Sequence, residues 1–196
     1  MSAPITRVER WNAGDYDMII DVRSPAEFAD DHLPGAVNLP VLDNDQRAEI
    51  GTMYKQVSPF AAKRAGAALV AGNIAVHLST ILQATDRNFR PLIYCWRGGQ
   101  RSGSMARIFS EIGWRTDLID GGYKRYRKQV LDGLDSLPQT LRLIVLRGRT
   151  GLAKTHILQA ARAKGAQVID LEGLANHRGS LLGPEPDGNQ PPQRLF

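Results

Sequence analysis

Four short apolar runs are separated along the chain by segments with helical spacing. The runs cover residues 18–22, 36–40, 91–95 and 116–120. Short apolar runs without strict alternation are typical of strands that are buried on both faces of a parallel sheet. Because such strands alternate with helical segments here, the sequence predicts an α/β fold with a mainly parallel sheet.

Three helices are predicted between these strands. Residues 61–70 are rich in alanine, and residues 75–84 carry apolar side chains at helical spacing. The third helix has apolar side chains at positions i, i+3, i+4 and i+7, which are Met105, Ile108, Phe109 and Ile112. Ser102 or Ser104 is available as its N-cap, and Gly113 is suited to end it.

The chain is predicted to contain two domains joined by a linker. The first domain covers residues 1–130, and the polar, proline-containing segment 131–140 is the predicted linker. The elements expected in residues 141–196 are a strand at 141–146, a helix at 154–163 and a strand at 167–171. A single βαβ unit has too little sheet to bury both of its faces, so we expect this second unit to be incomplete.

Charge is distributed unevenly along a chain whose net charge is +5. Residues 1–60 hold ten acidic and five basic side chains, whereas residues 87–128 hold ten basic and three acidic ones. A local excess of positive charge is typical of a surface that binds phosphates or nucleic acid. A solvated basic face with no ligand is the alternative.

The composition excludes several classes of protein. The chain is 42% hydrophobic and 23% charged, which differs from disordered, collagen-like and coiled-coil proteins. No apolar stretch approaches the ~20 residues of a membrane-spanning helix, and the first residues lack the apolar segment of a secretory signal. One cysteine cannot form an internal disulfide, so a cytoplasmic protein without a membrane partner is expected.

The cysteine lies where a predicted strand ends and a helix begins, in the sequence CWRGGQRS at residues 95–102. Backbone N–H groups of a glycine-containing loop at a helix N-terminus favour a bound anion. The charges of Arg97 and Arg101 are expected to lower the pKa of Cys95, which favours a thiolate nucleophile over an inert core cysteine. Such a thiolate suits an intermediate in which the cysteine carries sulfur, selenium or phosphate.

A phosphate-binding loop is indicated at the start of the second unit by Gly148, Gly151, Lys154 and Thr155. These residues follow a predicted strand and open a predicted helix, which is the context of the GxxxxGK[ST] motif. Ala153 replaces the glycine that precedes the lysine, and its Cβ is expected to crowd an approaching phosphate. A weakened phosphate site and a decayed turn that binds nothing are both compatible with this substitution.

Several segments resemble those of a known family. DVRSPAEF at 21–28 and HLPGAVNLP at 32–40 are similar to the N-terminal signature of rhodanese-like sulfurtransferase domains. Together with CWRGGQRS, the segments DGGYKRYR at 120–127 and DLEGLANHRGS at 170–180 resemble the tRNA 2-selenouridine synthase family. The resemblance covers almost the whole chain and implies a rhodanese-like domain followed by a P-loop domain that is shortened here.

The resemblance implies an enzyme that replaces the sulfur of 2-thiouridine at the wobble position of tRNA with selenium from selenophosphate. A geranylated intermediate made from geranyl diphosphate is part of the implied reaction. The resemblance assigns Cys95 as the selenium carrier, and Asp21 and Arg23 as residues that order the neighbouring loops. The residues implied to hold the anionic donor are Arg97, Gly98, Gly99, Gln100 and Arg101. tRNA is the implied partner, no metal ion or tightly bound cofactor is implied, and the oligomeric state stays open.

Two other functions are compatible with the same residues. Cys95, Arg101 and Ser102 satisfy the C-x5-R-[ST] signature of cysteine phosphatases, whose loop binds phosphate through similar amides. Trp96 and Arg97 at the rim of the loop, and the lack of an obvious general-acid aspartate in a nearby loop, argue against a phosphatase. A module that binds RNA through the basic face without catalysis is the third interpretation.

Overall fold

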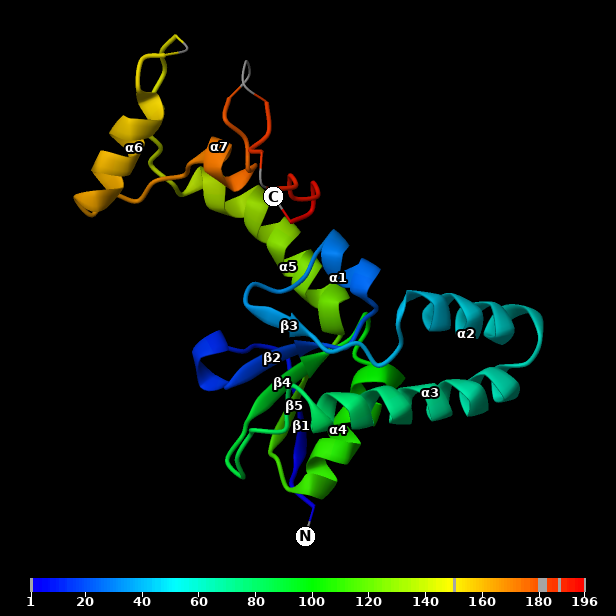
Figure 1. The fold of residues 1–196 in the computed structure, drawn as a ribbon. Helices are drawn as coiled ribbons and strands as arrows, with labels where there is room; N and C mark the ends of the chain where they lie inside the picture. Colours follow the sequence, from blue (N-terminus) through cyan, green and yellow to red (C-terminus); the bar gives the residue numbers. More distant parts are fainter. Residues whose placement is uncertain (1, 150, 180–182, 187, 196) are drawn as a thin grey trace. The chain divides into compact units, whose positions relative to one another are not determined.

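The computed structural model describes residues 2–149, 151–179, 183–186 and 188–195. Thr150 of the predicted phosphate loop and Ser180 of the last family segment lie outside the described residues. The chain forms two compact units that divide between Leu134 and Asp135. The division falls within the helix α5 (Gly122–Ser136), whose last two residues belong to the second unit (Figure 1).

The first unit is built on one five-stranded sheet in which every neighbouring pair of strands is parallel. The order of the strands in space is β1-β5-β4-β2-β3. The strands are β1 (Ile5–Val8), β2 (Met18–Asp21), β3 (Ala36–Asn38), β4 (Pro91–Tyr94) and β5 (Thr116–Ile119). The predicted α/β class and parallel sheet are therefore confirmed, and all four predicted strands are present. The edge strand β1 was not predicted, because Ile5–Val8 is short and mostly exposed.

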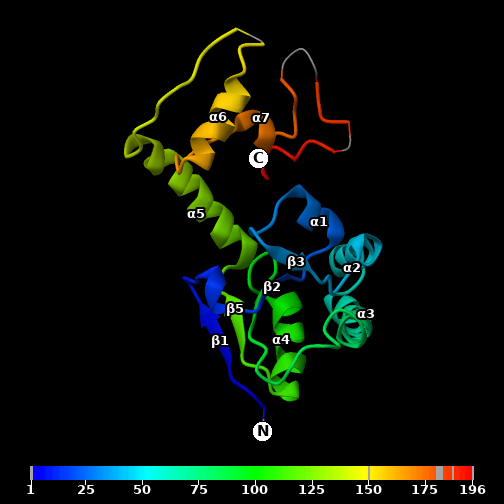
Figure 2. The same cartoon turned by 60° about the vertical axis from the view of Figure 1, so that its left-hand side comes forward.

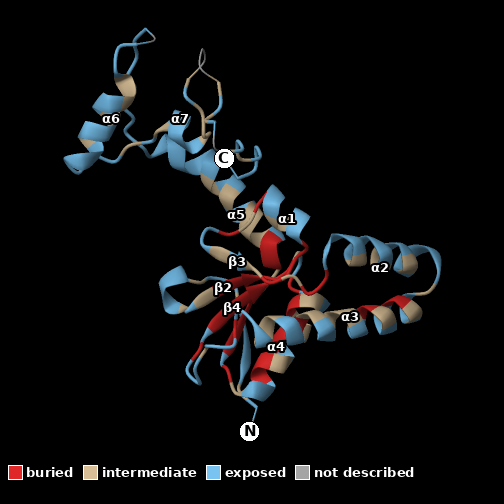
Figure 3. Ribbon diagram, viewed as in Figure 1, coloured by how far each residue is buried: buried red, intermediate tan, exposed pale blue. Residues whose placement is uncertain are grey.

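Helices lie on both faces of this sheet and bury each face in a separate cluster. One cluster holds residues of α3 (Pro59–Ser79) and α4 (Gln100–Ile112) with Ile20 and Ile93 of the strands. The other holds Tyr123 of α5 (Gly122–Ser136) with the strand residues Ile19, Leu92 and Ile119. Successive strand residues thus point to opposite faces, which is why the strands read as continuous apolar runs. Figures 2 and 3 show the helices around the sheet and the buried residues along β2 and β4.

Two predicted helices merge into one in the structure. The segments 61–70 and 75–84 belong to the single helix α3, which ends at Ser79 rather than at Ala84. It packs against α2 (Asn44–Gln56), a helix that was not predicted. The short helix α1 (Pro25–Asp30) follows β2.

The start of α4 differs from the prediction. Gly99 is the N-cap residue, whereas Ser102 and Ser104 lie inside the helix. The predicted stop at Gly113 is confirmed, because this residue is left-handed with φ = +105° and its N–H donates to the carbonyl oxygen of Phe109.

The predicted linker is helical. α5 continues through Ser136, and a short 3-10 helix covers Leu137–Gln139. Among the helices of the described residues, none combines the length and the apolar composition that a bilayer crossing requires.

The second unit contains the predicted helix but not the two predicted strands. α6 spans Lys154–Ala163, as predicted, and a further short helix, α7, spans Leu171–Leu174. Residues 141–146 and 167–170 form no strand, and in 141–146 the apolar side chains are exposed, with Ile144 at 94%. A strand needs a hydrogen-bonded neighbour, and the described part of this unit offers none except an isolated bridge between His177 and Pro184. The predicted βαβ unit is therefore wrong in its strands and right in its helix.

Candidate active site at the carboxyl edge of the sheet

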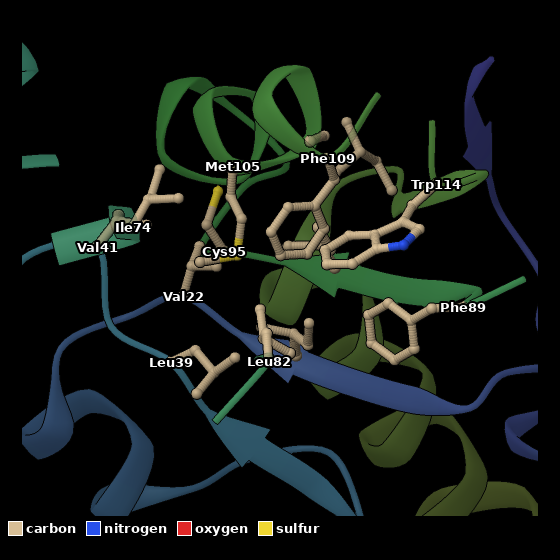
Figure 4. Close-up of a cluster of buried hydrophobic side chains, with 14 residues drawn as sticks. Val22, Leu39, Val41, Ile74, Leu82, Phe89, Cys95, Met105, Phe109 and Trp114 are labelled. Atoms are coloured by element: carbon tan, nitrogen blue, oxygen red, sulfur yellow. The ribbon is translucent and has the colours of Figure 1, made fainter. Parts of the chain in front are cut away.

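Cys95 is the first residue after β4, at the edge of the sheet where the parallel strands end. Binding sites in open parallel sheets lie at this edge. The side chain is 3% exposed and belongs to the hydrophobic cluster that includes Val22 and Met105 (Figure 4). Burial in an apolar cluster alone would keep a thiol protonated, so the polar contacts of the sulfur decide its chemistry.

Two hydrogen-bond donors lie against the sulfur. The backbone N–H of Gly99 and the hydroxyl of Ser102 both donate to Cys95 Sγ over 3.2 Å. Burial raises the pKa of the Cys95 thiol, but hydrogen bonds from the Ser102 hydroxyl and from the amides of Ser102, Gly99 and Arg97 lower it. The net pKa lies below the usual value, so the loop favours the thiolate.

The cause of this lowered pKa differs from the one predicted. The predicted cause was the charge of Arg97 and Arg101, yet the groups that act on the sulfur are amides and one hydroxyl. Arg101 Nη1 and Nη2 instead donate to the two carboxylate oxygens of Glu27, at 2.7 and 3.2 Å. Glu27 also accepts from the backbone N–H of Ser24, so the ion pair is held in place. The guanidinium charge is thereby balanced by a carboxylate.

Ser102 was considered as a possible helix cap and as part of the C-x5-R-[ST] signature, and the structure places its hydroxyl against Cys95 Sγ. The available signal is its position in the third residue of α4, since the first turn of a helix points its side chains back toward the preceding loop. Glu27 was missed altogether. It lies three residues after Ser24 at the start of a helix, a spacing that favours a carboxylate turned back toward the helix N-terminus.

We expect Ser102→Ala to raise the pKa of Cys95, because the variant loses a donor that favours the thiolate. The thiolate then forms only at higher pH, and alkylation by iodoacetamide near pH 7 becomes about tenfold slower, since a hydrogen bond to a charged group contributes about 1.5–3 kcal/mol. Alkylation rates across a pH series measure the effect. Ser104→Ala is the matched control, because the Ser104 hydroxyl donates to the carbonyl oxygen of Gln100. An unchanged profile in Ser102→Ala would contradict the assignment.

The cysteine loop is fixed by the start of α5, which closely follows β5. The N–H of Tyr123 donates to the carbonyl oxygen of Cys95 over 2.9 Å, and the N–H of Lys124 donates to that of Trp96 over 3.1 Å. Gly122 makes this approach possible, because a Cβ there would lie 2.2 Å from the Cys95 carbonyl oxygen. Gly98 also approaches closely from the other side, with a Cβ position 2.9 Å from the Ile119 carbonyl oxygen.

The buried pair of Asp21 and Arg23 orders the same edge of the sheet. Arg23 Nη2 donates to Asp21 Oδ2 and to the carbonyl oxygen of Asp31, both over 2.6 Å. The guanidinium carbon lies 4.0 Å from the ring centroid of Tyr123. Both charged side chains are at most 1% exposed. These contacts join β2, the segment after α1 and the start of α5, which agrees with the structural role expected for the pair.

The other predicted donor-binding residues occupy the same loop. Arg97, Gly99 and Gln100 are exposed, whereas Gly98 is buried. Arg7 Nη1 donates to the carbonyl oxygen of Gly98 over 2.9 Å, which adds a second cation beside the loop. Among the residues described, no group of three or more His, Cys, Asp or Glu side chains is arranged to hold a metal ion.

The basic stretch at 87–128 is partly neutralised. At least four of its ten cations form ion pairs with carboxylates, namely Arg90 with Asp117, Arg101 with Glu27, Arg125 with Glu9 and Asp120, and Arg127 with Asp31. Arg97, Lys124 and Lys128 are exposed. Arg97 belongs to the cysteine loop, and Lys124 lies in the first turn of α5, whose backbone contacts that loop. Fewer cations are therefore available to a phosphate than the ten basic residues of this stretch suggest.

In the second unit, the predicted phosphate-binding residues lie in and beside one loop. Gly151 and Ala153 are both left-handed, with φ of +86° and +53°. Lys154 Nζ donates to the carbonyl oxygen of Arg149 over 3.1 Å. Thr155 Oγ1 donates to Glu172 Oε2, also over 3.1 Å. Gly148 precedes the loop, and Ala153 adopts the backbone conformation that glycine adopts without strain.

Comparisons with known proteins agree with this arrangement. The family model described as rhodanese-like domain matches residues 7–129, which contain the sheet and Cys95. The chain belongs to the rhodanese-like family. A second model, described as tRNA 2-selenouridine synthase AAA domain, matches residues 141–196. The rhodanese-like domain and the segment that follows it thus match the two parts that the resemblance implied.

Curated relatives carry the name tRNA 2-selenouridine synthase. The chain is 42% identical to the protein of Cronobacter sakazakii and 39% identical to that of Nitrosomonas europaea, each over 166 residues. These alignments cover 84% of this chain and 43% of each relative, so the chain spans less than half the length of these relatives. A solved structure from Clostridium difficile 630, the N-terminal domain of a protein named for ATP/GTP binding, is 35% identical with a TM-score of 0.51. It covers 58% of this chain and 88% of that domain. The resemblance to this group of proteins is confirmed.

Proposed function

We propose that the chain is a transferase of the tRNA 2-selenouridine synthase type. In this proposal it replaces the sulfur of 2-thiouridine at the wobble position with selenium from selenophosphate, through a geranylated intermediate made from geranyl diphosphate. The observation that carries the proposal is the Cys95 thiol, whose pKa is lowered inside a rhodanese-like loop. The relatives' shared name gives the substrate class. The cytoplasm is the compartment that the proposal requires.

The proposed first step is attack by the Cys95 thiolate on the terminal atom of the donor. With thiosulfate, an S–S bond forms at Cys95 and the S–S bond to the sulfite group breaks, so sulfite leaves with the bonding electron pair. With selenophosphate, whose selenium is already at the selenide level, the S–Se bond forms by exchange on this persulfide. Selenium attacks the Cys95 sulfur, the S–S bond breaks and the outer sulfur leaves as sulfide, and water takes the phosphoryl group as phosphate. The thiolate is the required form, because a thiol is a poor nucleophile.

The loop suits an anionic donor through its amides and exposed cations. Arg97 is exposed, Arg7 lies at the Gly98 carbonyl, and α4 directs its N-terminus toward the loop. We assign Arg97, Gly98, Gly99 and Gln100 to the donor site on this basis, since amides and arginines at a helix N-terminus favour anions. Arg101 has a different role, because its guanidinium is paired with Glu27.

The basic side chains beside the loop suit the phosphates of tRNA. Arg97, Lys124 and Lys128 are exposed, and the spacing of the two lysines places them on one face of α5. Attraction between such side chains and phosphates is independent of sequence and weakens as salt is added.

Gly148, Gly151, Lys154 and Thr155 are assigned to a phosphate or pyrophosphate group of the substrate. We expect Ala153→Gly to tighten binding of inorganic pyrophosphate by about fivefold, because it removes the Cβ that is expected to crowd an approaching phosphate. Isothermal titration calorimetry measures the change. Ala160→Gly inside α6 is the control, where glycine only weakens the helix. Equal affinities of wild type and Ala153→Gly would contradict this assignment.

The proposed function is tested on tRNA carrying wobble 2-thiouridine. The chain is incubated with the tRNA, thiosulfate, selenophosphate and geranyl diphosphate, and the nucleosides of the digested tRNA are identified by mass spectrometry. The proposal predicts 2-selenouridine with wild type and none with Cys95→Ser. Absence of the product with wild type contradicts it. Release of p-nitrophenol from its phosphate ester, lost in Cys95→Ser, would favour the phosphatase interpretation instead.

A further inference from the structure

A hollow of about 490 Å³ lies beside the cysteine loop. Its volume is in the range of sites that hold a small organic group, which is about 300–1,000 Å³. The lining residues come from α1, α2, the cysteine loop and α4, and are Ala26, Glu27, Asp30, Arg47, Trp96 and Arg101. Two lining residues are sequence neighbours of the sulfur and of its donor. Trp96 directly follows Cys95, and Arg101 directly precedes Ser102, whose hydroxyl donates to Cys95 Sγ.

The charges of the lining argue against an anion as the occupant. Glu27 and Asp30 are acidic, whereas Arg47 and Arg101 are basic, so the formal charges of the lining cancel. Arg101 is moreover held by both oxygens of Glu27. The carboxylates of Glu27 and Asp30 would repel a donor with several negative charges. Such a donor is better bound by the amides of the cysteine loop.

The lining instead suits a flat, neutral ring that carries both hydrogen-bond donors and acceptors. Trp96 supplies an aromatic surface, and its indole packs against the ring of Tyr123 with 5.2 Å between the centroids. Tyr123 is itself fixed, because its hydroxyl donates to Asp31 Oδ2 over 2.7 Å and Arg23 lies on its ring. Glu27 offers acceptor oxygens and Arg47 offers donors. An aromatic surface beside such groups is how proteins hold an unstacked nucleobase.

We propose that this hollow receives the nucleobase on which the enzyme acts, with Trp96 as the stacking surface and the Glu27–Arg101 pair at the edge of the base. The inference rests on the proposed function and adds to it the place of the base. An enzyme that modifies a base must take it out of the helical stack, because the reacting atom is otherwise covered. The hollow places that base beside the loop that begins at Cys95.

The test is a double-mutant cycle that compares RNA affinity with and without the Trp96 ring, and with and without the base. Binding is measured by fluorescence anisotropy for two labelled RNA stem–loops, one with 2-thiouridine at the wobble position and one with an abasic site there. Wild type is expected to bind the first at least about tenfold more tightly, since stacking contributes about 1–3 kcal/mol per base. Trp96→Ala is expected to bind both with the lower affinity, because contacts to phosphate remain. Trp96→Phe keeps an aromatic ring and is expected to retain most of the preference.

The proposal is overturned if Trp96→Ala still prefers the 2-thiouridine stem–loop as strongly as wild type, or if wild type shows no preference. Urea unfolding of the variants separates a lost fold from a lost stacking surface. If Trp96→Ala unfolds, Trp96→Leu carries the test, because it keeps an apolar side chain without an aromatic face and is expected to lose the preference. Loading of Cys95 with sulfur or selenium is measured on the wild-type preparation without RNA. If Cys95 loads and the cycle shows no coupling, only the nucleobase site is wrong. If Cys95 does not load, the proposed function itself fails.

Discussion

Gly122→Ala is expected to lower the free energy of unfolding of the first unit by about 3–5 kcal/mol, because it combines backbone strain with a steric clash. The residue is left-handed with φ = +57°, and a Cβ would lie 2.2 Å from the carbonyl oxygen of Cys95 and 2.7 Å from the amide nitrogen of Gly98. Both neighbours are backbone atoms, so no side chain can rotate away. The start of α5 must then move away from the cysteine loop. The hydrogen bond from the Tyr123 N–H to the Cys95 carbonyl oxygen is lost with it.

Urea denaturation measures this effect, and Gly103→Ala is the matched control. Gly103 lies inside α4, and a Cβ there meets nothing within 4 Å. Alanine is expected to stabilise the helix at this position by about 0.5–1 kcal/mol. The two alanine substitutions therefore change stability in opposite directions. Similar unfolding midpoints for the two variants would contradict the contact between the loops.

Arg23→Met is expected to lower the free energy of unfolding by about 3–5 kcal/mol, because it leaves the carboxylate of Asp21 buried without its partner. Asp21 is fully buried and receives three hydrogen bonds from the Arg23 guanidinium. The variant also loses the stacking of the guanidinium on Tyr123. This is a large part of the stability of a typical domain, which is about 5–15 kcal/mol.

The double variant Asp21→Asn with Arg23→Met separates the charge from the packing. It removes the buried charge together with its partner, so it is expected to be more stable than Arg23→Met alone. Urea denaturation of the two single variants and the double variant gives the coupling energy. Additive losses would mean that the pair stabilises the edge of the sheet through packing rather than through charge.

The sequence was informative wherever a residue's role depends on its local pattern. The runs at 91–95 and 116–120 predicted β4 and β5, because a strand buried on both faces is continuously apolar. Gly113 predicted the end of α4, because helices commonly end at a left-handed residue and glycine adopts that conformation without strain. The place of Cys95 between β4 and α4 was found for the same reason, since strand, loop and helix follow directly in the chain.

Roles that depend on distant contacts were not predictable. The sequence offers Arg101 as a ligand of the donor, but it does not show that Glu27, 74 residues away in the chain, accepts hydrogen bonds from it. The segment 141–146 has the composition of a strand, but composition does not supply the neighbouring strand that its hydrogen bonds require. The hollow beside Trp96 likewise forms only when α1, α2 and α4 come together around the cysteine loop.

Loading of Cys95 with a chalcogen is the most direct test of its role as a carrier. Wild type and Cys95→Ser are incubated with selenophosphate, and in parallel with thiosulfate, and the intact proteins are weighed by mass spectrometry under non-reducing conditions. Wild type is expected to gain one selenium or one sulfur atom, whereas Cys95→Ser is expected to gain neither. No gain by wild type with either donor, or an equal gain by Cys95→Ser, would contradict it.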